Sequence, residues 1–216
     1  MATYLQTVNG VLQRLREQTV STVNQTDYSK LIGKFVNDAK NQVEASYNWN
    51  ALSDTLTAVT SANIFSYVLT GSGVRFRMID AYNDTEDIPL QIIDSVSMNR
   101  YFFTGTPESG SPRYISFNGT DANGDTLVDV YPKPDGVYTL RFNVALPQPD
   151  LTSDSTVISV PAEIVEQFAY ARALVERGED GGLPSSEAYQ LAKNIMSDYI
   201  AIESSRRPEE MQWVAN

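Results

Sequence analysis

The chain has 216 residues, of which 42% are hydrophobic and 20% charged, and its formal net charge is −11. This balance predicts a globular protein with a buried core, in one domain or two small ones. Cys and His are both absent, which excludes disulfides, thiolate or imidazole metal ligands, and Ser-His-Asp or Cys-His catalysis. We therefore expect no metal and no cofactor, and we expect neither a secretory signal nor a membrane span.

The excess of negative charge lies beyond the first 54 residues, in which five basic residues balance five acidic ones. An acidic surface repels the phosphate backbone, so the sequence predicts no tight binding of nucleic acid. Two interpretations remain open. The charge keeps the protein dispersed in solution, or it forms a wall along which DNA slides without sticking.

The N-terminal segment predicts two helices. In the first, apolar residues recur at three- and four-residue steps, at Leu5, Val8, Leu12 and Leu15. A second, longer helix is expected to follow its N-cap residue Asp27. The apolar stripe of this helix is predicted at Leu31, Phe35, Ala39, Val43 and Tyr47. Trp49 comes just after it and is interpreted as a structural plug where the helices meet the strands.

The hydrophobic period changes to two between Thr55 and Val160, which indicates β-strands. The alternating positions that are expected to face the core are Val74, Phe76 and Met78 in one strand and Tyr138, Leu140, Phe142 and Val144 in another. Three hairpins are predicted, with turns at residues 71–73, at residues 132–136 and around residues 121–125. The second turn is expected to place Gly136 at a positive φ. Strands joined by short hairpins predict an antiparallel sandwich or barrel.

Two more helices are predicted in the C-terminal segment. Pro161 suits the first helical position of one of them and Gly178 marks its end. The stripe of this helix is predicted at Ile164, Phe168, Ala171 and Val175. Ser185 or Ser186 is expected to cap the last helix. Its stripe is predicted at Ala188, Ala192, Ile195, Tyr199 and Ile202.

The order of helices, strands and helices predicts an α+β fold. We expect a helix bundle built from the N- and C-terminal helices, with a central antiparallel β-sandwich or barrel inserted between them. The expected boundaries are residues 1–54 for the N-terminal helices, 55–160 for the β domain, 161–205 for the C-terminal helices and 206–216 for a C-terminal tail.

Few side chains are candidates for catalysis or metal binding. Asp121, Asn123 and Asp125 have the spacing of the first ligands of a calcium loop, but Thr126 stands where that loop needs Gly. A polar hairpin tip is the better interpretation. Glu163 and Glu166 are a possible acid–base pair, yet glutamates in the first turn of a helix are expected from the helix dipole alone. The sequence therefore predicts no catalytic site.

The order of short motifs resembles that of head-to-tail adaptor proteins of tailed phages, called tail tubular protein A in short-tailed phages. The N-terminal part has a short helix, a "TVST" turn and a long helix that ends near Trp49. The middle has "GSPRY", "YPKP", an alternating strand and a closing helix after "VP". The resemblance covers residues 5–205. Family members often have Gly-Glu-Pro where this chain has Arg16-Glu17-Gln18.

This resemblance implies a virion protein without enzymatic activity. It implies a homo-oligomeric ring, expected to be a dodecamer, that binds the portal protein on one side and the tail nozzle or tube protein on the other. The ring would sit at the head–tail junction after synthesis in the host cytoplasm. The genome DNA would pass through it without sequence-specific binding, and no membrane partner is expected.

The C-terminal tail is expected to be a docking element. The stripe of the last helix ends at Ile202, and Arg206 and Arg207 precede a proline that breaks the periodicity. Beyond it, Met211 and Trp213 are too few to build a core, yet Trp is favoured at binding hot spots. The resemblance implies contact with the portal or a neighbouring subunit. The alternative is a frayed terminus whose Trp213 folds back on its own chain.

Two other functions remain open at the level of sequence. One is a β-sandwich binding module, such as a carbohydrate-binding tail protein or a capsid decoration protein, because twelve Tyr and two Trp can supply a stacking platform. The predicted strands, however, place most aromatic residues on the inward face. The other is a hydrolase that uses only Asp and Glu.

Overall fold

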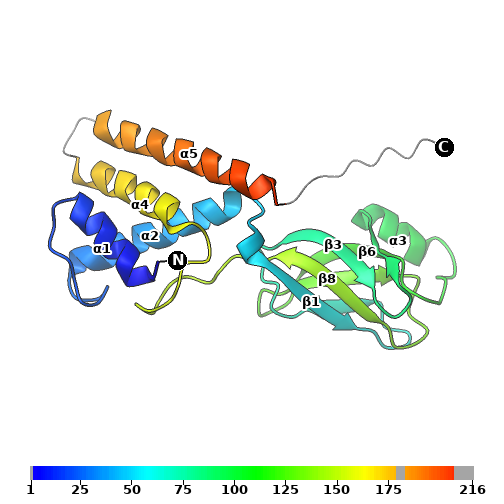
Figure 1. The fold of residues 1–216 in the computed structure, drawn as a ribbon. Helices are drawn as coiled ribbons and strands as arrows, with labels where there is room; N and C mark the ends of the chain where they lie inside the picture. The colour runs from blue at the N-terminus through cyan, green and yellow to red at the C-terminus, as the bar shows by residue number, and fades with distance from the viewer. Residues whose placement is uncertain (1, 179–182, 207–216) are drawn as a thin grey trace, which may run out of the picture. The chain divides into compact units, whose positions relative to one another are not determined.

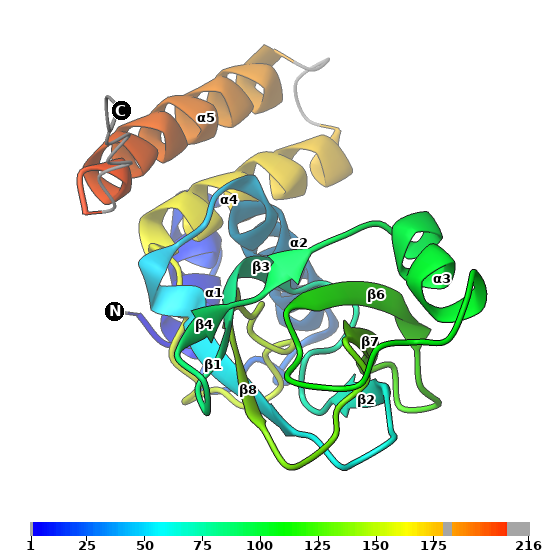
Figure 2. The same ribbon diagram turned by 90° about the vertical axis from the view of Figure 1, so that its right-hand side faces the viewer.

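The computed structural model describes residues 2–178 and 183–206. The chain divides into two compact units, one from residues 1–51 and 148–216 and one from residues 52–147. The first unit is helical and the second contains two sheets, so the expected α+β class with a β insert between terminal helices is confirmed (Figure 1; Figure 2). The sequence prediction placed residues 148–160 in the β domain, but in the structure they belong to the helical unit.

The helical unit combines helices from both ends of the chain. Their bounds are Tyr4–Arg14 for α1, Asp27–Ser46 for α2, Ala162–Arg177 for α4 and Leu183–Ser204 for α5, with a short 3₁₀ turn at Asn50–Leu52. Helices α2 and α4 are central, because α1 packs against both of them and α5 packs against α4. In Figure 1, α4 and α5 lie side by side and run in opposite directions.

Helix α1 buries its predicted stripe and ends in a Schellman motif. Val8, Leu12 and Leu15 are buried as expected, and Leu5 is half-buried. At the C-terminus, the N–H of Arg16 donates to the Gln13 carbonyl at 3.0 Å, and the next N–H donates to the Leu12 carbonyl at 2.9 Å. Arg16 therefore has a left-handed backbone, with φ 59°. This position normally favours glycine.

We expect Arg16→Gly to raise the free energy of unfolding by about 0.5–1 kcal/mol. The left-handed conformation costs an L-residue about 1–2 kcal/mol, part of which is offset by the greater freedom of glycine in the unfolded chain. Arg16→Val should lower the free energy of unfolding by about 1 kcal/mol, because a β-branched residue fits this conformation worst. Urea denaturation followed by helical circular dichroism measures both variants. A destabilised Arg16→Gly would contradict the prediction.

Helix α2 differs from its prediction at the N-terminus. Thr26 is the N-cap and Asp27 is the first helical residue. The Thr26 hydroxyl accepts from the Ser29 N–H at 2.9 Å, and the Ser29 hydroxyl oxygen accepts from the Thr26 N–H at 3.0 Å. This reciprocal capping box satisfies two backbone N–H groups, those of Thr26 and Ser29. With Asp27 as the N-cap, Lys30 would take the place of Ser29 and could not accept the return hydrogen bond.

The buried face of α2 is also rotated away from the predicted stripe. Leu31, Phe35 and Tyr47 are half-buried, and this part of the prediction was wrong. The most buried apolar residues of the helix are Ile32, Val36, Ala39 and Val43. The spacing of apolar residues did not predict this face, because two charged residues, Lys40 and Glu44, are buried on it as well.

Lys40 and Glu44 form a buried clasp that holds the chain where it re-enters the helical unit. The Lys40 ammonium is fully buried and lies 3.3 Å from both carboxylate oxygens of Glu44. It also donates to the Gln148 carbonyl, and the Gln148 N–H donates to Glu44 at 3.2 Å. Asn37 lies about one turn before Lys40 on the same helix. Its side-chain amide donates to the Leu151 carbonyl at 3.1 Å and accepts from the Leu151 N–H at 2.7 Å.

Helix α4 packs on more than one side, as its wide stripe predicts. Pro161 is its N-cap rather than its first helical residue, and Gly178 ends it in the left-handed conformation, with φ 62°. Ile164, Phe168 and Ala171 are buried, but Val175 is 67% exposed. The last turn of the predicted stripe therefore lies open to solvent.

Helix α5 begins before both serines that were expected to cap it. Ser185 and Ser186 lie inside the helix, so that prediction was wrong. Pro184 falls in the first helical turn, where the missing N–H of proline costs no hydrogen bond. Ala188 and Ala192 are buried, whereas the stripe becomes half-buried at Ile195 and Tyr199 and Ile202 is 56% exposed.

The second unit consists of two four-stranded sheets and one helix. The bounds are Ser53–Val59 for β1, Ser66–Leu69 for β2, Arg77–Asn83 for β3, Ile88–Pro89 for β4, Gln91–Ile92 for β5, Ser95–Phe103 for α3, Tyr114–Thr120 for β6, Thr126–Tyr131 for β7 and Thr139–Ala145 for β8. The strand orders are β1-β8-β3-β4 and β2-β7-β6-β5.

Two of the three predicted hairpins are wrong. Strands β2 and β3 belong to different sheets, and so do β7 and β8, so the turns at residues 71–73 and 132–136 carry the chain from one sheet to the other. Gly136 is not among the residues with positive φ. The third hairpin, β6–β7, is confirmed. Alternation of apolar and polar residues marks a strand but does not identify its partner.

Two features of the β unit differ from the prediction: one strand pair is parallel, and a helix lies between β5 and β6. The helix was missed because residues 55–160 were interpreted as strands throughout. Strand β5 pairs with β6 in parallel orientation. Helix α3 begins at the N-cap Asp94, whose carboxylate accepts from the Ser97 N–H at 3.2 Å. Met98 and Phe102 form its buried face. Their spacing of four residues after a capping aspartate was the signal for this helix.

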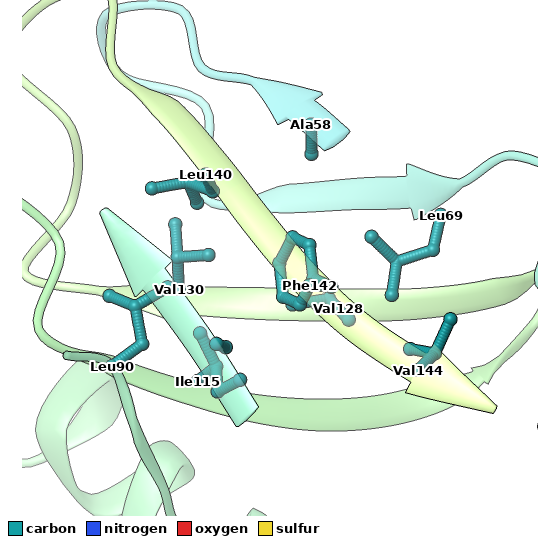
Figure 3. Close-up of a cluster of buried hydrophobic side chains, with 10 residues drawn as sticks. Ala58, Leu69, Leu90, Ile115, Val128, Val130, Leu140, Phe142 and Val144 are labelled. Atoms are coloured by element: carbon teal, nitrogen blue, oxygen red, sulfur yellow. The ribbon is translucent and has the colours of Figure 1, made fainter. Parts of the chain in front are cut away.

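A single hydrophobic cluster lies between the two sheets. In Figure 3, side chains from both sheets point toward one another around the ring of Phe142, which is fully buried. The buried members are Ala58, Leu69, Ala81, Leu90, Ile115, Val128, Val130, Leu140, Phe142 and Val144. Strand β8 supplies Leu140, Phe142 and Val144, which confirms the predicted inward face of that strand.

Candidate functional site

The C-terminal end of α5 carries the one predicted docking residue that the structure describes. The Arg206 guanidinium pairs with the Glu203 carboxylate at 3.2 Å. The other oxygen of Glu203 accepts from the Asn50 N–H at 2.7 Å, which ties the end of α5 to the turn after α2. Arg207, Met211 and Trp213 lie outside the described residues.

A groove of about 540 Å³ adjoins this end of the helix. Trp49, Pro161, Tyr199, Ile202 and Arg206 are among the residues that line it. Trp49 is 2% exposed and donates its indole N–H to the Val43 carbonyl at 2.7 Å, so it is a packing residue of the helical unit. The groove therefore lies beside Arg206, the last residue that the structure describes.

A second groove, the α4–α5 groove, has a volume of about 690 Å³. We define it by Phe35, Ala171, Arg172, Val175, Glu176 and Tyr189. Phe35 comes from α2, and the others come from the end of α4 and the start of α5. The walls are mainly apolar, and these residues include one basic side chain, Arg172, and one acidic side chain, Glu176. The predicted stripes assigned Phe35 and Val175 to the core, and their exposure is what opens the groove.

The two glutamates considered as an acid–base pair have separate partners. The Glu163 carboxylate accepts from the Tyr199 hydroxyl at 2.9 Å, and Glu166 pairs with Arg14 at 2.7 Å. The hydrogen bond to Glu163 raises the pKa of Tyr199, because ionisation of the phenol would remove the proton that it donates. Both contacts join helices, so the geometry assigns these glutamates a packing role.

The loop that resembles a calcium site is a hairpin tip closed by its own backbone. One oxygen of Asp121 accepts from the N–H groups of Asn123 at 2.8 Å and Asp125 at 2.9 Å. The hydrogen bond from Asp125 is the main cause that lowers the pKa of Asp121. Over residues 2–178 and 183–206, no group of three or more acidic side chains is placed to hold a metal ion.

The β unit presents aromatic side chains around α3. Tyr101 stacks on Tyr131 at 4.7 Å between ring centroids and on Tyr114 at 5.7 Å, and Phe102 contacts Phe65 at 4.5 Å. Tyr101 and Phe102 come from α3, whereas Tyr114 and Tyr131 come from β6 and β7. Met98, Phe102 and Tyr131 form a cluster separate from the one between the sheets, which the expectation that most aromatic residues face inward missed.

Two aromatic side chains at the end of α3 are exposed, on either side of the buried Phe102. Tyr101 is 41% exposed and Phe103 is 79% exposed. The "RYFF" run at the end of α3 was the sequence signal for the patch, since two adjacent phenylalanines in a helix cannot face the same side. Exposed aromatic residues of this kind are enriched at protein interfaces.

Among the helices of the described chain, none is both long and apolar enough to cross a membrane.

Comparison with known proteins identifies the family. No curated relative matches the chain. A family model described as SU10 adaptor protein matches residues 2–212, which include both units. Because this match extends over nearly the whole chain, the protein belongs to that family of phage adaptor proteins, whose members are structural components of the virion.

Proposed function

We propose that the protein is the head-to-tail adaptor of a phage particle, forms a ring between the portal and the tail, and lines the passage for the genome. Membership of the phage adaptor family is the observation that carries this proposal. The motif order, which resembles that of tail tubular protein A, is the reason for proposing a dodecameric ring that contacts the portal protein and the tail nozzle or tube protein. In this role the protein acts by assembly rather than by catalysis.

The charge of the chain supports a passage through which DNA moves freely. The net charge is −11, and acidic walls repel the phosphate backbone at short range while salt screens the repulsion beyond about 10 Å. DNA would therefore slide past the ring without sequence-specific contacts. The same charge also keeps the free subunit soluble before assembly.

Electron microscopy of the protein mixed with the portal of its phage tests this proposal. We expect a ring stacked on the portal. A protein that stays monomeric with the portal and binds immobilised glycans would instead support a carbohydrate-binding module. The stacked rings of Tyr101, Tyr114 and Tyr131 are the observation that favours this second function. The stacking contacts already occupy one face of Tyr131, so the platform available to a sugar is small.

The C-terminal tail is proposed to dock onto the portal or a neighbouring subunit. We expect deletion of residues 208–216 to leave the melting temperature of the free chain within about 2 °C, because the helical stripes end before residue 208. The same deletion should weaken or abolish ring assembly on the portal. Scanning calorimetry measures the first effect and electron microscopy the second. A deletion variant that unfolds would place the tail in the core, and one that assembles with full affinity would remove its docking role.

A further inference from the structure

We propose that Asn123, at the tip of the β6–β7 hairpin, is a site of spontaneous deamidation, and that the fold protects the other two Asn-Gly pairs of the chain. The three pairs are Asn9-Gly10, Asn118-Gly119 and Asn123-Gly124. The reaction uses only the chain and water, so the inference does not depend on the proposed ring. It is carried by the different hydrogen bonds that hold the three asparagines.

The reaction is an attack by a backbone nitrogen on the side chain that precedes it. The Gly124 amide nitrogen, which has lost its proton to hydroxide, forms a bond to Cγ of Asn123. The bond from Cγ to the side-chain nitrogen breaks, ammonia leaves with a proton from water, and a cyclic succinimide remains. Glycine favours this attack because it has no Cβ to hinder the approach.

Water then opens the ring in one of two ways. It adds to one of the two ring carbonyls and breaks the bond between that carbonyl and the Gly124 nitrogen. Addition at Cγ gives aspartate. Addition at the backbone carbonyl gives isoaspartate, in which the main chain runs through the former side chain.

The reacting groups of Asn123 are weakly held. Its side-chain amide donates to the Asp121 carboxylate at 3.2 Å, and the Gly124 N–H donates to the Asp121 carbonyl at 3.2 Å. Both distances are at the long end of the range for an N–H···O hydrogen bond. A shorter bond of 2.8 Å anchors the Asn123 N–H, but this group takes no part in the reaction. Asn123 is exposed at a loop tip, so water reaches its side chain.

Asn9 is protected by strong hydrogen bonds on both sides of its amide. Its Nδ2 donates to the Val20 carbonyl at 2.9 Å, and its Oδ1 accepts from the Val20 N–H at 2.9 Å. Gly10 lies inside α1, where backbone N–H groups are committed to the helical ladder. Attack would therefore require two side-chain hydrogen bonds and a turn of the helix to break.

Asn118 is protected by its contact with a buried carboxylate. It is exposed and lies where the β6–β7 register shifts, but its amide donates to one oxygen of Asp129 at 2.9 Å. Asp129 is 8% exposed, and its other oxygen is buried without a hydrogen-bond partner. Release of Asn118 would therefore leave a buried carboxylate short of a second partner, which is costly. We expect Asn118 to react more slowly than Asn123 for this reason.

Deamidation changes the tip that Asp121 organises. A carboxylate replaces the Asn123 donor, so Asp121 loses one hydrogen bond and faces a second negative charge. Isoaspartate also lengthens the backbone inside the closure in which the Asp121 N–H donates to the Asp125 carbonyl at 2.8 Å. The chain then carries one negative charge more than its present −11. Because a virion protein is not replaced after assembly, the modified fraction should increase with the age of the particle.

Timed incubation of the folded, full-length protein tests this inference. Brief proteolysis at acidic pH and mass spectrometry then quantify the acid form of each Asn-Gly peptide. We expect deamidation at Asn123 to be at least about tenfold faster than at Asn118, with Asn9 the slowest. The rate at Asn123 should rise with pH, because the nucleophile is the deprotonated amide. Asn123→Gln should remove the rapid modification from the tip peptide, because a glutamine would have to form a larger ring.

The same chain unfolded in urea is the matched control. Without the fold, the three pairs should react at rates within about threefold of one another, because glycine follows each asparagine. Equal rates at Asn123 and Asn118 in the folded protein would overturn the proposal, and so would a faster rate at Asn118. A rate at Asn123 that is more than about tenfold below its rate in urea would show that the hairpin tip protects this residue as well, and would also overturn it.

Discussion

Replacement of Lys40 by methionine is expected to lower the free energy of unfolding of the helical unit by about 3–5 kcal/mol. Methionine fills most of the volume of the lysine side chain but removes its charge. The Glu44 carboxylate, whose side chain is 1% exposed, then remains buried without its cation. The Gln148 carbonyl also loses its donor, so the segment that re-enters the helical unit is held less tightly.

Lys34→Met is the matched control for this substitution. Lys34 lies on the exposed side of the same helix and should change stability by less than about 0.5 kcal/mol. The double variant Lys40→Met/Glu44→Leu should recover at least about 1 kcal/mol of the loss, because no uncompensated charge is left in the interior. Urea denaturation of all three variants measures these differences. Equal effects of Lys40→Met and Lys34→Met would show that the clasp contributes nothing to stability.

Phe142→Ala should lower the stability of the β unit by about 3–5 kcal/mol. The ring is fully buried and contacts both sheets, so its removal leaves a cavity that two hydrogen-bonded sheets cannot close (Figure 3). Native-state hydrogen exchange measures the effect by segment, which matters because a chain with two units need not unfold in one step. The amides of β7 and β8 should exchange faster.

Phe103→Ala provides the comparison within the same unit. Phe103 is 79% exposed, and its truncation should change exchange in β7 and β8 by less than the equivalent of about 0.5 kcal/mol. A similar loss of protection in both variants would mean that the centre of the β unit does not depend on Phe142.

The sequence was most informative where local periodicity and burial agree. Ile164 and Phe168 in α4, and Leu140 and Phe142 in β8, lie on the buried faces that their spacing predicts. The exclusion of Cys and His chemistry also needed no structure, because it depends only on which side chains are present. Motif order, together with the family match, was sufficient to identify a phage adaptor.

Tertiary packing decided the features that depend on residues far apart in the sequence. Lys40 reads as a surface residue until Glu44 and Gln148 are brought around it. The pairing partners of β7 and β8 depend on how the two sheets pack around their shared core. The alternation within a single strand does not specify that pairing. The grooves arise in the same way. Val175 continues an apolar stripe in the sequence, and only the arrangement of α2, α4 and α5 leaves it open to solvent, because a helix buries only the part of its stripe that a neighbour covers.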